Sequence, residues 1–532
     1  MIAPSAQPAG PSSNPRWLEG RQHLLQGRLD DAHQVLASMR IHEPDAALTH
    51  LLAAQIAWRE NGIRDGAAFA LEAARAGCAD PETLCTVIAV LLVTGEIVAA
   101  RELLEHPSLR ACDNPLLLMR IAGHRKRLEE HAEALALLDR AQAQGHDSPA
   151  LRFRRGEELM FNGRLAEAEA EFAESLAQAP GHGHVAVPLV RLRKQTPEHN
   201  HLESITRSLD AVKQGGTDHA ALEFARYKTL EDLGRDQEAW EALAHGNALM
   251  YARLRDQAEQ RSAGLEPFLE QCVPGILRAR ARPVEGARPI FVVGMPRSGS
   301  TLLERMLGNH SGVTVAGELP DMGSQLHWVA DTRNAYADVL LARLPEVDFA
   351  EVGRRYLAQT QWRAGGKRIY IDKHSPNWAL AGVIHAALPQ APILNLVRDP
   401  MDVCFSNWRM FFGDASAWSY DQSTLACYCA DYQRTMARWH ALMPGAILDV
   451  RYADLVHDPE TTLRKVIDFC GLEWEPGCVD ISRNAAPSST LSAAQVRSGV
   501  HTRAFGEWRR YEAQLSGLIQ TLSPTPDSAP SP

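Results

Sequence analysis

The sequence lacks a long apolar run and an apolar leader. Its longest apolar stretch, LCTVIAVLLVTG at residues 84–95, is too short to span a bilayer and is typical of a buried helix. Residues 1–16 are rich in Pro and Ser and contain no apolar core of the kind that defines a signal peptide. We therefore expect a disordered lead over residues 1–15 and no membrane partner.

The sequence also lacks the cysteine and histidine spacings of metal sites and disulfide frameworks. Its nine cysteines are scattered, which favours a reducing, cytoplasmic location. The pairs His182/His184 and His199/His201 have no third ligand nearby, so we interpret them as solvated loop residues and expect no metal. A net charge of −10 argues against a nucleic-acid partner.

The N-terminal half repeats a pattern of small and apolar residues every 34 positions. The small positions of this register are Ala32, Gly66, Ala100, Ala134 and Ala168. The matching apolar positions are Leu36, Ala70, Leu104, Leu138 and Phe172. Because small residues let two helices approach closely, the pattern predicts an all-α array over residues 16–260, with a less regular sixth unit at Ala239. A generic helical bundle is the alternative, which five units in one register disfavour.

The period and the residue types of these units resemble tetratricopeptide repeats. The resemblance implies a superhelix whose concave groove binds a peptide or a protein. The same array could instead mediate a homodimer.

The C-terminal half changes to short apolar runs that alternate with helical segments. A stretch rich in Pro, Gly and Arg precedes it and predicts a linker over residues 261–288. The apolar runs occupy residues 290–294, 368–372, 391–397 and 446–452. This alternation predicts an α/β P-loop-like domain over residues 289–522 with a central, mainly parallel sheet, and a disordered tail over residues 523–532. Ligands of such sheets bind beyond the carboxyl ends of the strands.

The loop after the first run, GMPRSGST at residues 294–301, lacks the lysine of a triphosphate-binding loop. Its glycines let the backbone N–H groups at a helix start face an anion, and Arg297 adds a forked cation. The hydroxyls of Ser298, Ser300 and Thr301 add further donors. Without the lysine and a Mg²⁺-binding acidic strand end, triphosphate hydrolysis is disfavoured. A structural turn without a ligand is the alternative.

A second anion site is indicated by NLVRDPMDVCFSNW at residues 395–408. Asp399 followed by Pro400 is typical of a helix start, with Asp399 as the N-cap. Arg398 then ends a strand, and Ser406 lies about two turns into the helix. Two separated anion sites suggest a nucleotide with phosphates at both its 5′ and 3′ ends.

Together these motifs resemble those of sulfotransferases, which use 3′-phosphoadenosine 5′-phosphosulfate as sulfuryl donor. IDKHSPNW at 371–378, VRYADL at 450–455 and TLSAAQVRSGVHTRAFGEWRRYE at 490–512 add to the resemblance. It covers residues 289 to about 520. It is closest to the branch that includes tyrosylprotein sulfotransferases and bacterial proteins with fused tetratricopeptide repeats.

The resemblance implies roles for individual residues. The 5′-phosphosulfate would be held by Arg297, Ser298, Gly299, Ser300 and Thr301, and the 3′-phosphate by Arg398 and Ser406. Tyr452 and Ser492 match further donor-contacting positions. Glu318 falls at the position of the catalytic carboxylate, and Lys373 matches a lysine near the transferred group.

The chain departs from the family pattern in its late segment. Ser498 and Glu507 stand where the family often has lysines, and Arg497 or Arg503 could substitute for them. The arginine that follows the 3′-phosphate serine is displaced to Arg409.

The resemblance implies in-line sulfuryl transfer with Glu318 as the base, while Lys373 and Arg297 stabilise negative charge. His374 is the reserve base, and His310 is interpreted as structural. Lys373 could instead pair with Asp372 and serve only the fold. Trp508 and Tyr511 could pack on the adenine, although a core position is favoured.

Other functions stay open at the level of the sequence. A non-catalytic scaffold with a degenerate nucleotide site is the main alternative, and a P-loop kinase is disfavoured by the missing lysine. The acceptor could be a protein or peptide tyrosine docked by the repeats, a carbohydrate or a small hydroxylated metabolite.

Overall fold

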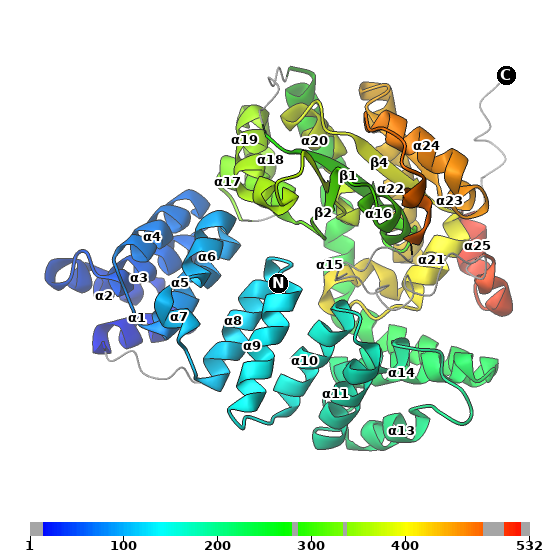
Figure 1. Cartoon of the computed structure of the whole chain (residues 1–532), viewed down its shortest axis with the longest axis horizontal. Coiled ribbons are helices and arrows are strands. Elements are labelled where there is room, and N and C mark those ends of the chain that lie inside the picture. The colour runs from blue at the N-terminus through cyan, green and yellow to red at the C-terminus, as the bar shows by residue number, and fades with distance from the viewer. Residues whose placement is uncertain (1–13, 279–285, 334–337, 482–504, 523–532) are drawn as a thin grey trace.

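The N-terminal half consists of helical hairpins that follow one another in an arc beside the α/β domain (Figure 1). The computed structural model describes residues 14–278, 286–333, 338–481 and 505–522. The first five hairpins are α1 (Pro15–Leu25) and α2 (Leu29–His42), α3 (Ala47–Arg59) and α4 (Ile63–Arg75), α5 (Pro81–Val93) and α6 (Ile97–Leu104), α8 (Pro115–Arg127) and α9 (His131–Ala143), and α10 (Pro149–Phe161) and α11 (Leu165–Gln178). A short helix, α7 (Pro107–Arg110), lies between the third and fourth hairpins.

The spacing of the hairpins confirms the repeat predicted from the sequence. The second helices begin at residues 29, 63, 97, 131 and 165, the same 34-residue step as the sequence pattern. Every small and apolar position of the two series is buried, from Ala32 and Leu36 to Ala168 and Phe172. The small positions therefore lie where helices meet, as the packing argument requires.

Four of the first helices, α1, α5, α8 and α10, share a sequence-encoded start. The side chains of their N-cap residues accept from one or two backbone N–H groups of the first turn, and a proline follows at the first helical position: Asn14, Asp80, Asn114 and Ser148. Proline has no N–H to leave unsatisfied there, and the capping side chain satisfies the groups that remain.

The array ends in less regular helices: α12 (Ala186–Arg191), α13 (Leu202–Ala211), α14 (Thr217–Asp232) and α15 (Asp236–Arg278). Ala239, the small position of the sixth unit, is fully buried in α15. The prediction of a linker over residues 261–288 is wrong as far as Arg278, because α15 continues to that residue. Phe268, Leu269 and Cys272 are buried in the same apolar cluster as the sheet, so packing against the α/β domain holds this part of the helix in place.

The C-terminal domain contains a five-stranded, entirely parallel sheet in the order β2-β3-β1-β4-β5. Its strands are β1 (Arg288–Gly294), β2 (Val313–Val315), β3 (Ile369–Asp372), β4 (Ile393–Val397) and β5 (Ile447–Arg451). Four of them match the predicted apolar runs. The sequence interpretation missed β2, which is too short to show a clear apolar run.

Helices cover both faces of the sheet, and the residues of β1 alternate between them. Ile290 and Val292 belong to a cluster with α16 (Ser300–Gly308) and α24 (Pro459–Phe469). Phe291 and Val293 belong to a larger cluster with α20 (Ala381–Ala387), α22 (Gln422–Leu442) and α15. Buried parallel strands require such two-sided cover, so the fold class predicted from the sequence is confirmed.

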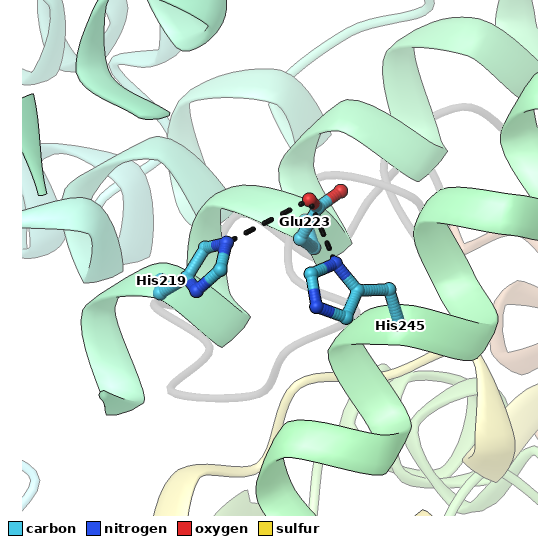
Figure 2. Close-up of side chains that lie close together, drawn as sticks. All are labelled: His219, Glu223 and His245. Atoms are coloured by element: carbon cyan, nitrogen blue, oxygen red, sulfur yellow. Dashed lines mark hydrogen bonds and ion pairs between the residues drawn. The ribbon is translucent and has the colours of Figure 1, made fainter. Parts of the chain in front are cut away.

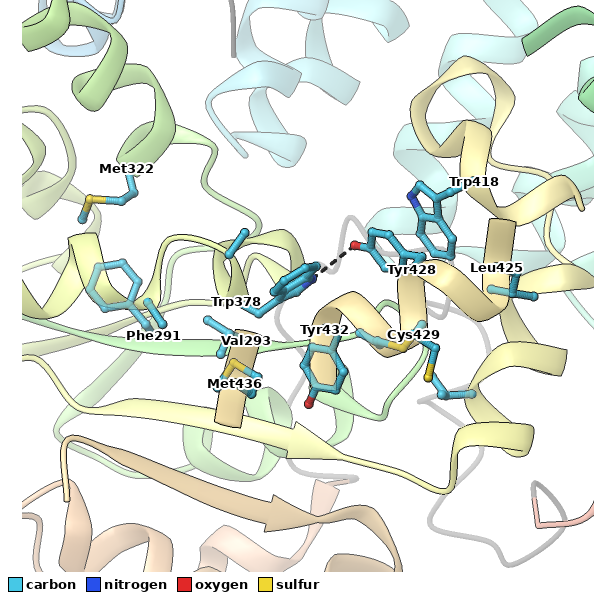
Figure 3. Packing of buried hydrophobic residues seen from close by; sticks show 14 of the residues in the cluster. Phe291, Val293, Met322, Trp378, Trp418, Leu425, Tyr428, Cys429, Tyr432 and Met436 are labelled. Carbon is cyan, nitrogen blue, oxygen red and sulfur yellow. Dashed lines mark hydrogen bonds between the residues drawn. The ribbon is translucent and has the colours of Figure 1, made fainter. Parts of the chain in front are cut away.

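Aromatic residues fill the face of the sheet that α22 covers (Figure 3). The rings of Trp418 and Tyr428 stack with their centroids 3.7 Å apart, and Trp378 Nε1 donates a hydrogen bond of 3.2 Å to the Tyr428 hydroxyl. The polar groups of Trp378 and Tyr428 therefore satisfy each other inside the cluster, as buried Tyr and Trp side chains usually require.

The remaining helices of the domain are α17 (Asp321–Ala330), α18 (Asp338–Arg343), α19 (Phe349–Thr360), α21 (Pro400–Trp408), α23 (Tyr452–His457) and α25 (Ser516–Leu522). Polar contacts join several of them to the array. Gln325 Nε2 donates to the Gly95 carbonyl at 2.9 Å, and Arg355 forms an ion pair with Glu96 at 2.7 Å. Within the described ranges, every helix is too short or too polar to cross a bilayer.

Candidate active site

The loop between β1 and α16 has the backbone geometry of an anion site. Gly294, Arg297 and Gly299 have φ angles of 142°, 69° and 108°, and the first of these lies so close to the Leu396 carbonyl that a Cβ would meet its oxygen at 2.8 Å. A positive φ is costly for arginine, and such strain is typical of functional loops. The loop ends at Ser300, where α16 directs its first N–H groups towards the loop.

The hydroxyls predicted to bind an anion are buried in this loop. Ser298, Ser300 and Thr301 expose 1%, 6% and 7% of their surface. Among the described residues, Ser298 Oγ has no hydrogen-bond partner. A buried hydroxyl without a partner is expensive, and a bound anion would accept its hydrogen bond.

The second predicted anion motif lies against the first. Asp399 accepts a hydrogen bond of 3.0 Å from Asp402 N and caps α21, as predicted. Arg398, which directly follows β4, donates to the Arg297 carbonyl at 2.9 Å. Ser406 is buried in α21, and its Oγ lies 3.4 Å from Arg297 Nε. The two sequence motifs therefore form one site at the carboxyl edge of the sheet.

Tyr452 closes the loop from the side of β5. Its ring lies against Gly299, where a Cβ would meet Tyr452 Cδ2 at 2.3 Å. The guanidinium carbon of Arg398 lies over the same ring, 4.9 Å from its centroid. Only glycine fits beneath the ring. Position 299 therefore requires glycine for two reasons, the close approach of Tyr452 and the positive φ.

Arginines concentrate charge in this site. Burial, followed in order of effect by the neighbouring charges of Arg191, Arg409 and Arg398, lowers the pKa of Arg297 to about 9. Arg409 also forms ion pairs with Glu231 at 3.7 Å and with Glu507. A buried guanidinium among like charges is stabilised when an anion binds.

Lysine and carboxylate side chains lie at the other end of the sheet edge. Lys373 directly follows β3, exposes 1% of its side chain and forms an ion pair with Glu318, which lies just beyond β2. Glu304 Oε2 lies 3.9 Å from Lys373 Nζ. Although burial opposes its charge, the two glutamates raise the pKa of Lys373, so it stays a cation.

Sequence reasoning missed Glu304, which stands on the buried face of α16. Burial raises its pKa to about 7, although the charge of Lys373 opposes the shift. The sequence signal for Glu304 was a charged residue one turn after Ser300 in a largely apolar helix. Sequence alone cannot distinguish such a residue from one that faces solvent.

The sequence left alternative roles open for Lys373, His310 and His374, and the structure gives the contacts that each of them makes. Asp372 accepts a hydrogen bond of 2.7 Å from the Tyr356 hydroxyl, so Lys373 pairs with Glu318 and not with Asp372. His310 lies 2.9 Å from the Glu473 carbonyl and accepts from Gly312 N, as a structural residue would. Burial lowers the pKa of His374, whose Nδ1 has no partner among the described residues.

A turn of the helical array touches the loop that carries Glu318. Glu129, between α8 and α9, has a positive φ of 63° and lies against Gly317, whose φ is 90°. A Cβ on Gly317 would meet Glu129 Oε2 at 2.6 Å. His131 holds this turn, because its ring nitrogens lie 3.2 Å from Glu129 and 2.8 Å from Glu158. The array therefore borders the carboxylate end of the site.

The late segment is described only in part. Ser492 and Arg497, with Ser498 and Arg503, lie outside the described residues, so their predicted roles stay predictions. Tyr511 is 1% exposed and its ring lies 5.2 Å from that of Trp240, which agrees with a core position.

The histidine pairs noted in the sequence make ordinary polar contacts. His184 lies 2.8 Å from Asp218, and His201 lies 2.9 Å from Glu169.

A separate group, His219, Glu223 and His245, joins α14 to α15 (Figure 2). Because Gly215 N donates to His219 Nδ1 at 3.1 Å, a neutral His219 carries its proton on Nε2, the nitrogen nearest to Glu223 at 3.8 Å. This arrangement favours a hydrogen-bonded cluster over a metal site.

Comparison with known proteins agrees with the geometry. Residues 289–476 match the model of the Sulfotransferase family. The C-terminal domain therefore carries the sequence pattern of that family, from β1 to the segment after α24.

Two curated relatives and one solved structure are similar to this chain. An uncharacterised protein of Aquifex aeolicus is 29% identical over 60% of this chain, which spans only 43% of that protein. A Caenorhabditis briggsae protein named as a candidate protein-tyrosine sulfotransferase is 23% identical over 41% of this chain and 80% of its own length. The sulfotransferase domain from the curacin biosynthetic pathway is 20% identical, covers 44% of this chain and 99% of its own, and has a TM-score of 0.28.

Proposed function

We propose that this chain transfers a sulfuryl group from 3′-phosphoadenosine 5′-phosphosulfate to a hydroxyl group of a protein or peptide. One observation carries the proposal. Arg297, Arg398 and Ser406, from two distant motifs, lie together at the sheet edge that also presents the Lys373–Glu318 pair.

The donor would lie across the loop after β1. Ser298, Ser300, Thr301 and the N–H groups at the start of α16 would bind its 5′-phosphosulfate, and Arg398 with Ser406 would bind its 3′-phosphate. The buried hydroxyl of Ser298 and the lowered pKa of Arg297 support an anionic ligand here. Tyr452 would pack over Gly299 and keep water from the loop.

The carboxylate end supports the chemical step. Glu318 would take the proton of the acceptor hydroxyl while the acceptor oxygen attacks sulfur. The bond between sulfur and the donor's 5′-phosphate oxygen breaks, and Lys373 and Arg297 would stabilise the charge that develops on that oxygen. Glu304 and Glu318 hold the Lys373 ammonium in place from two sides.

The array supports an acceptor that is larger than a metabolite. Its hairpins form an arc beside the α/β domain, and arrays of this kind bind peptides along their concave side (Figure 1). The Glu129 turn reaches the loop of Glu318, so a segment bound by the array would pass close to the proposed base. The name of the Caenorhabditis briggsae relative adds tyrosine as the candidate hydroxyl.

The first experiment is calorimetric titration with adenosine 3′,5′-bisphosphate, the desulfated product, and with ATP. We expect tight bisphosphate binding, weak ATP binding, and loss of bisphosphate binding in Arg398→Ala. The matched control is Arg451→Ala, an exposed arginine at the end of β5, which should bind as the wild type does. Folded wild-type protein that does not bind the bisphosphate would contradict the proposal.

A further inference from the structure

Arg191 brings a cation of the helical array to the donor end of the site. It is the last residue of α12, and its Nη2 donates a hydrogen bond of 2.8 Å to the Arg409 carbonyl. Arg409 follows α21 directly, and Ser406 lies one turn earlier in that helix. A residue of the array thus lies at the same helix end as the serine proposed to bind the 3′-phosphate.

The charge of Arg191 is not neutralised by an ion pair with any carboxylate of the described residues. The two carboxylates that favour its charge, Glu231 and Asp232, have other partners. Glu231 accepts from the Tyr227 hydroxyl at 2.7 Å and pairs with Arg409, while Asp232 binds Lys228 and accepts from Gln195 N at 2.9 Å. Burial and then the charge of Arg409 lower the pKa of Arg191 to about 10.

The charge of Arg191 acts on Arg297. Of the charged neighbours that lower the pKa of Arg297, Arg191 has the largest effect, before Arg409 and Arg398. The positive charges of two guanidiniums from different halves of the chain therefore repel each other inside the protein. Such repulsion costs free energy, which a bound anion would offset.

A purely structural role accounts for only part of this geometry. A cation near the end of α21 interacts favourably with the helix dipole, and the bond to the Arg409 carbonyl serves that end. This bond uses one N–H of a guanidinium that has several, arranged as a fork that suits phosphate oxygens. Capping α21 would not account for the repulsion between the charges of Arg191 and Arg297.

We propose that Arg191 binds the 3′-phosphate of the donor, so that the helical array supplies part of the nucleotide site. The inference rests on the proposed function, because it takes the phosphate beside Ser406 to be the 3′-phosphate. Array residues then act on the donor in two ways: Arg191 touches it, and Glu231 fixes Arg409 beside it. Donor binding would join α12 to α21 across the boundary between the two halves.

The test compares two nucleotides and four forms of the full-length chain by calorimetry. Wild type, Arg191→Met, Arg191→Lys and the control Arg207→Met, an exposed arginine of α13, are titrated with adenosine 3′,5′-bisphosphate and with 5′-AMP. We expect Arg191→Met to bind the bisphosphate about ten- to a hundredfold more weakly, the range of a lost charge-assisted hydrogen bond, and 5′-AMP almost unchanged. Arg191→Lys should bind the bisphosphate about three- to tenfold more weakly, because an ammonium keeps the charge but not the fork of the guanidinium, and Arg207→Met should bind both nucleotides as the wild type does.

The outcomes separate the inference from the function on which it rests. If the wild type does not bind the bisphosphate, the proposed function fails first. If the wild type binds it and Arg191→Met binds it equally well, or loses both nucleotides to the same degree, a contact with the 3′-phosphate is wrong. If Arg191→Met does not fold, Arg191→Lys is the test. Unchanged affinity for 5′-AMP together with weaker binding of the bisphosphate supports the contact. Unchanged affinity for both nucleotides contradicts it.

Discussion

One buried cation of the helical array and one of the α/β domain lie in opposite electrostatic surroundings. In the array, His131 is buried, yet its hydrogen bonds to Glu129 and Glu158 outweigh the effect of burial and raise its pKa to about 9. At the edge of the sheet, burial and the charges of three neighbouring arginines together lower the pKa of Arg297 to about 9. The charge of His131 is stabilised by the fold itself, whereas that of Arg297 is destabilised by it.

This difference indicates where a ligand is needed. A charged group with its counter-charges in place serves stability, and the protein gains nothing more from binding an ion there. A buried cation among like charges stores free energy that an anionic ligand releases on binding. The donor end of the sheet edge has this second character, because Arg297, the buried Ser298 hydroxyl and Arg191 of the array act there.

The largest effect is expected for a substitution that removes the proposed base and leaves the fold intact. Glu318→Gln removes the proposed base but keeps an oxygen that can accept from Lys373. We expect the rate of sulfuryl transfer to a simple phenol such as 2-naphthol to fall by about a hundred- to ten-thousandfold, the usual range for a lost general base. The measurement is transfer of radiolabelled sulfate from the donor, with Kd for the bisphosphate unchanged.

The control for this variant is Glu346→Gln, an exposed carboxylate of the same domain, which should keep the wild-type rate. A Glu318→Gln protein within about threefold of the wild-type rate would exclude Glu318 as the base. His374, with its lowered pKa and unpartnered Nδ1 among the described residues, would then be the next candidate.

The second prediction concerns the paired charge of the array. Because the folded-state pKa of His131 lies above the ordinary value of 6.5, its stabilising effect is complete below pH 6.5 and is lost as the pH rises through 9. The free energy of unfolding should fall by up to about 3 kcal/mol over this window for this residue alone. Urea titrations of the wild type and His131→Gln at several pH values measure the difference.

The two proteins should differ most at low pH and converge above pH 9. His42→Gln, an exposed position on α2, should leave the pH profile as it is. A His131→Gln variant whose stability runs parallel to that of the wild type from pH 6 to 10 would show that the imidazole is neutral in the fold.

Much of the fold could be predicted because it depends on short-range patterns. The 34-residue period determines which side chains of each hairpin are buried, so Ala32 and Phe172 fall where helices meet. Apolar runs bounded by turns predicted four of the five strands. The boundary near Arg278 could not be predicted in this way, because Phe268 and Cys272 hold α15 against a domain that follows later in the chain.

The site could be predicted where its residues belong to one motif. Arg297 and Ser298 stand in the loop after β1 and Arg398 directly follows β4, and the carboxyl ends of the strands meet at one edge in any parallel sheet. Arg191, Glu129 and Glu304 carry no such signal. Two of them come from a repeat array whose other charged residues are mostly solvated or paired, and their position at the site follows only from how the array packs on the domain.

The smallest expected effect compares the same capping motif in the two regions. Asp80 caps α5 in the array and Asp399 caps α21 at the site, and in both cases the next residue is proline. Replacement by alanine should cost each protein about 1 kcal/mol of stability, the usual value of an N-cap. Urea titration measures this loss of stability, and calorimetric titration with the bisphosphate measures the affinity of each variant for the donor's desulfated product.

Only the second cap borders the proposed donor. Asp399→Ala loosens the first turn of α21, and with it the direction of Arg398 and Ser406, so we expect about three- to tenfold weaker bisphosphate binding. Asp80→Ala should leave that affinity unchanged at the same loss of stability. If both variants weakened binding equally, the site would respond to global stability, and the contrast between a self-sufficient array and a ligand-dependent sheet edge would be wrong. If only Asp399→Ala does so, the same local structure serves the fold in one region and the ligand in the other.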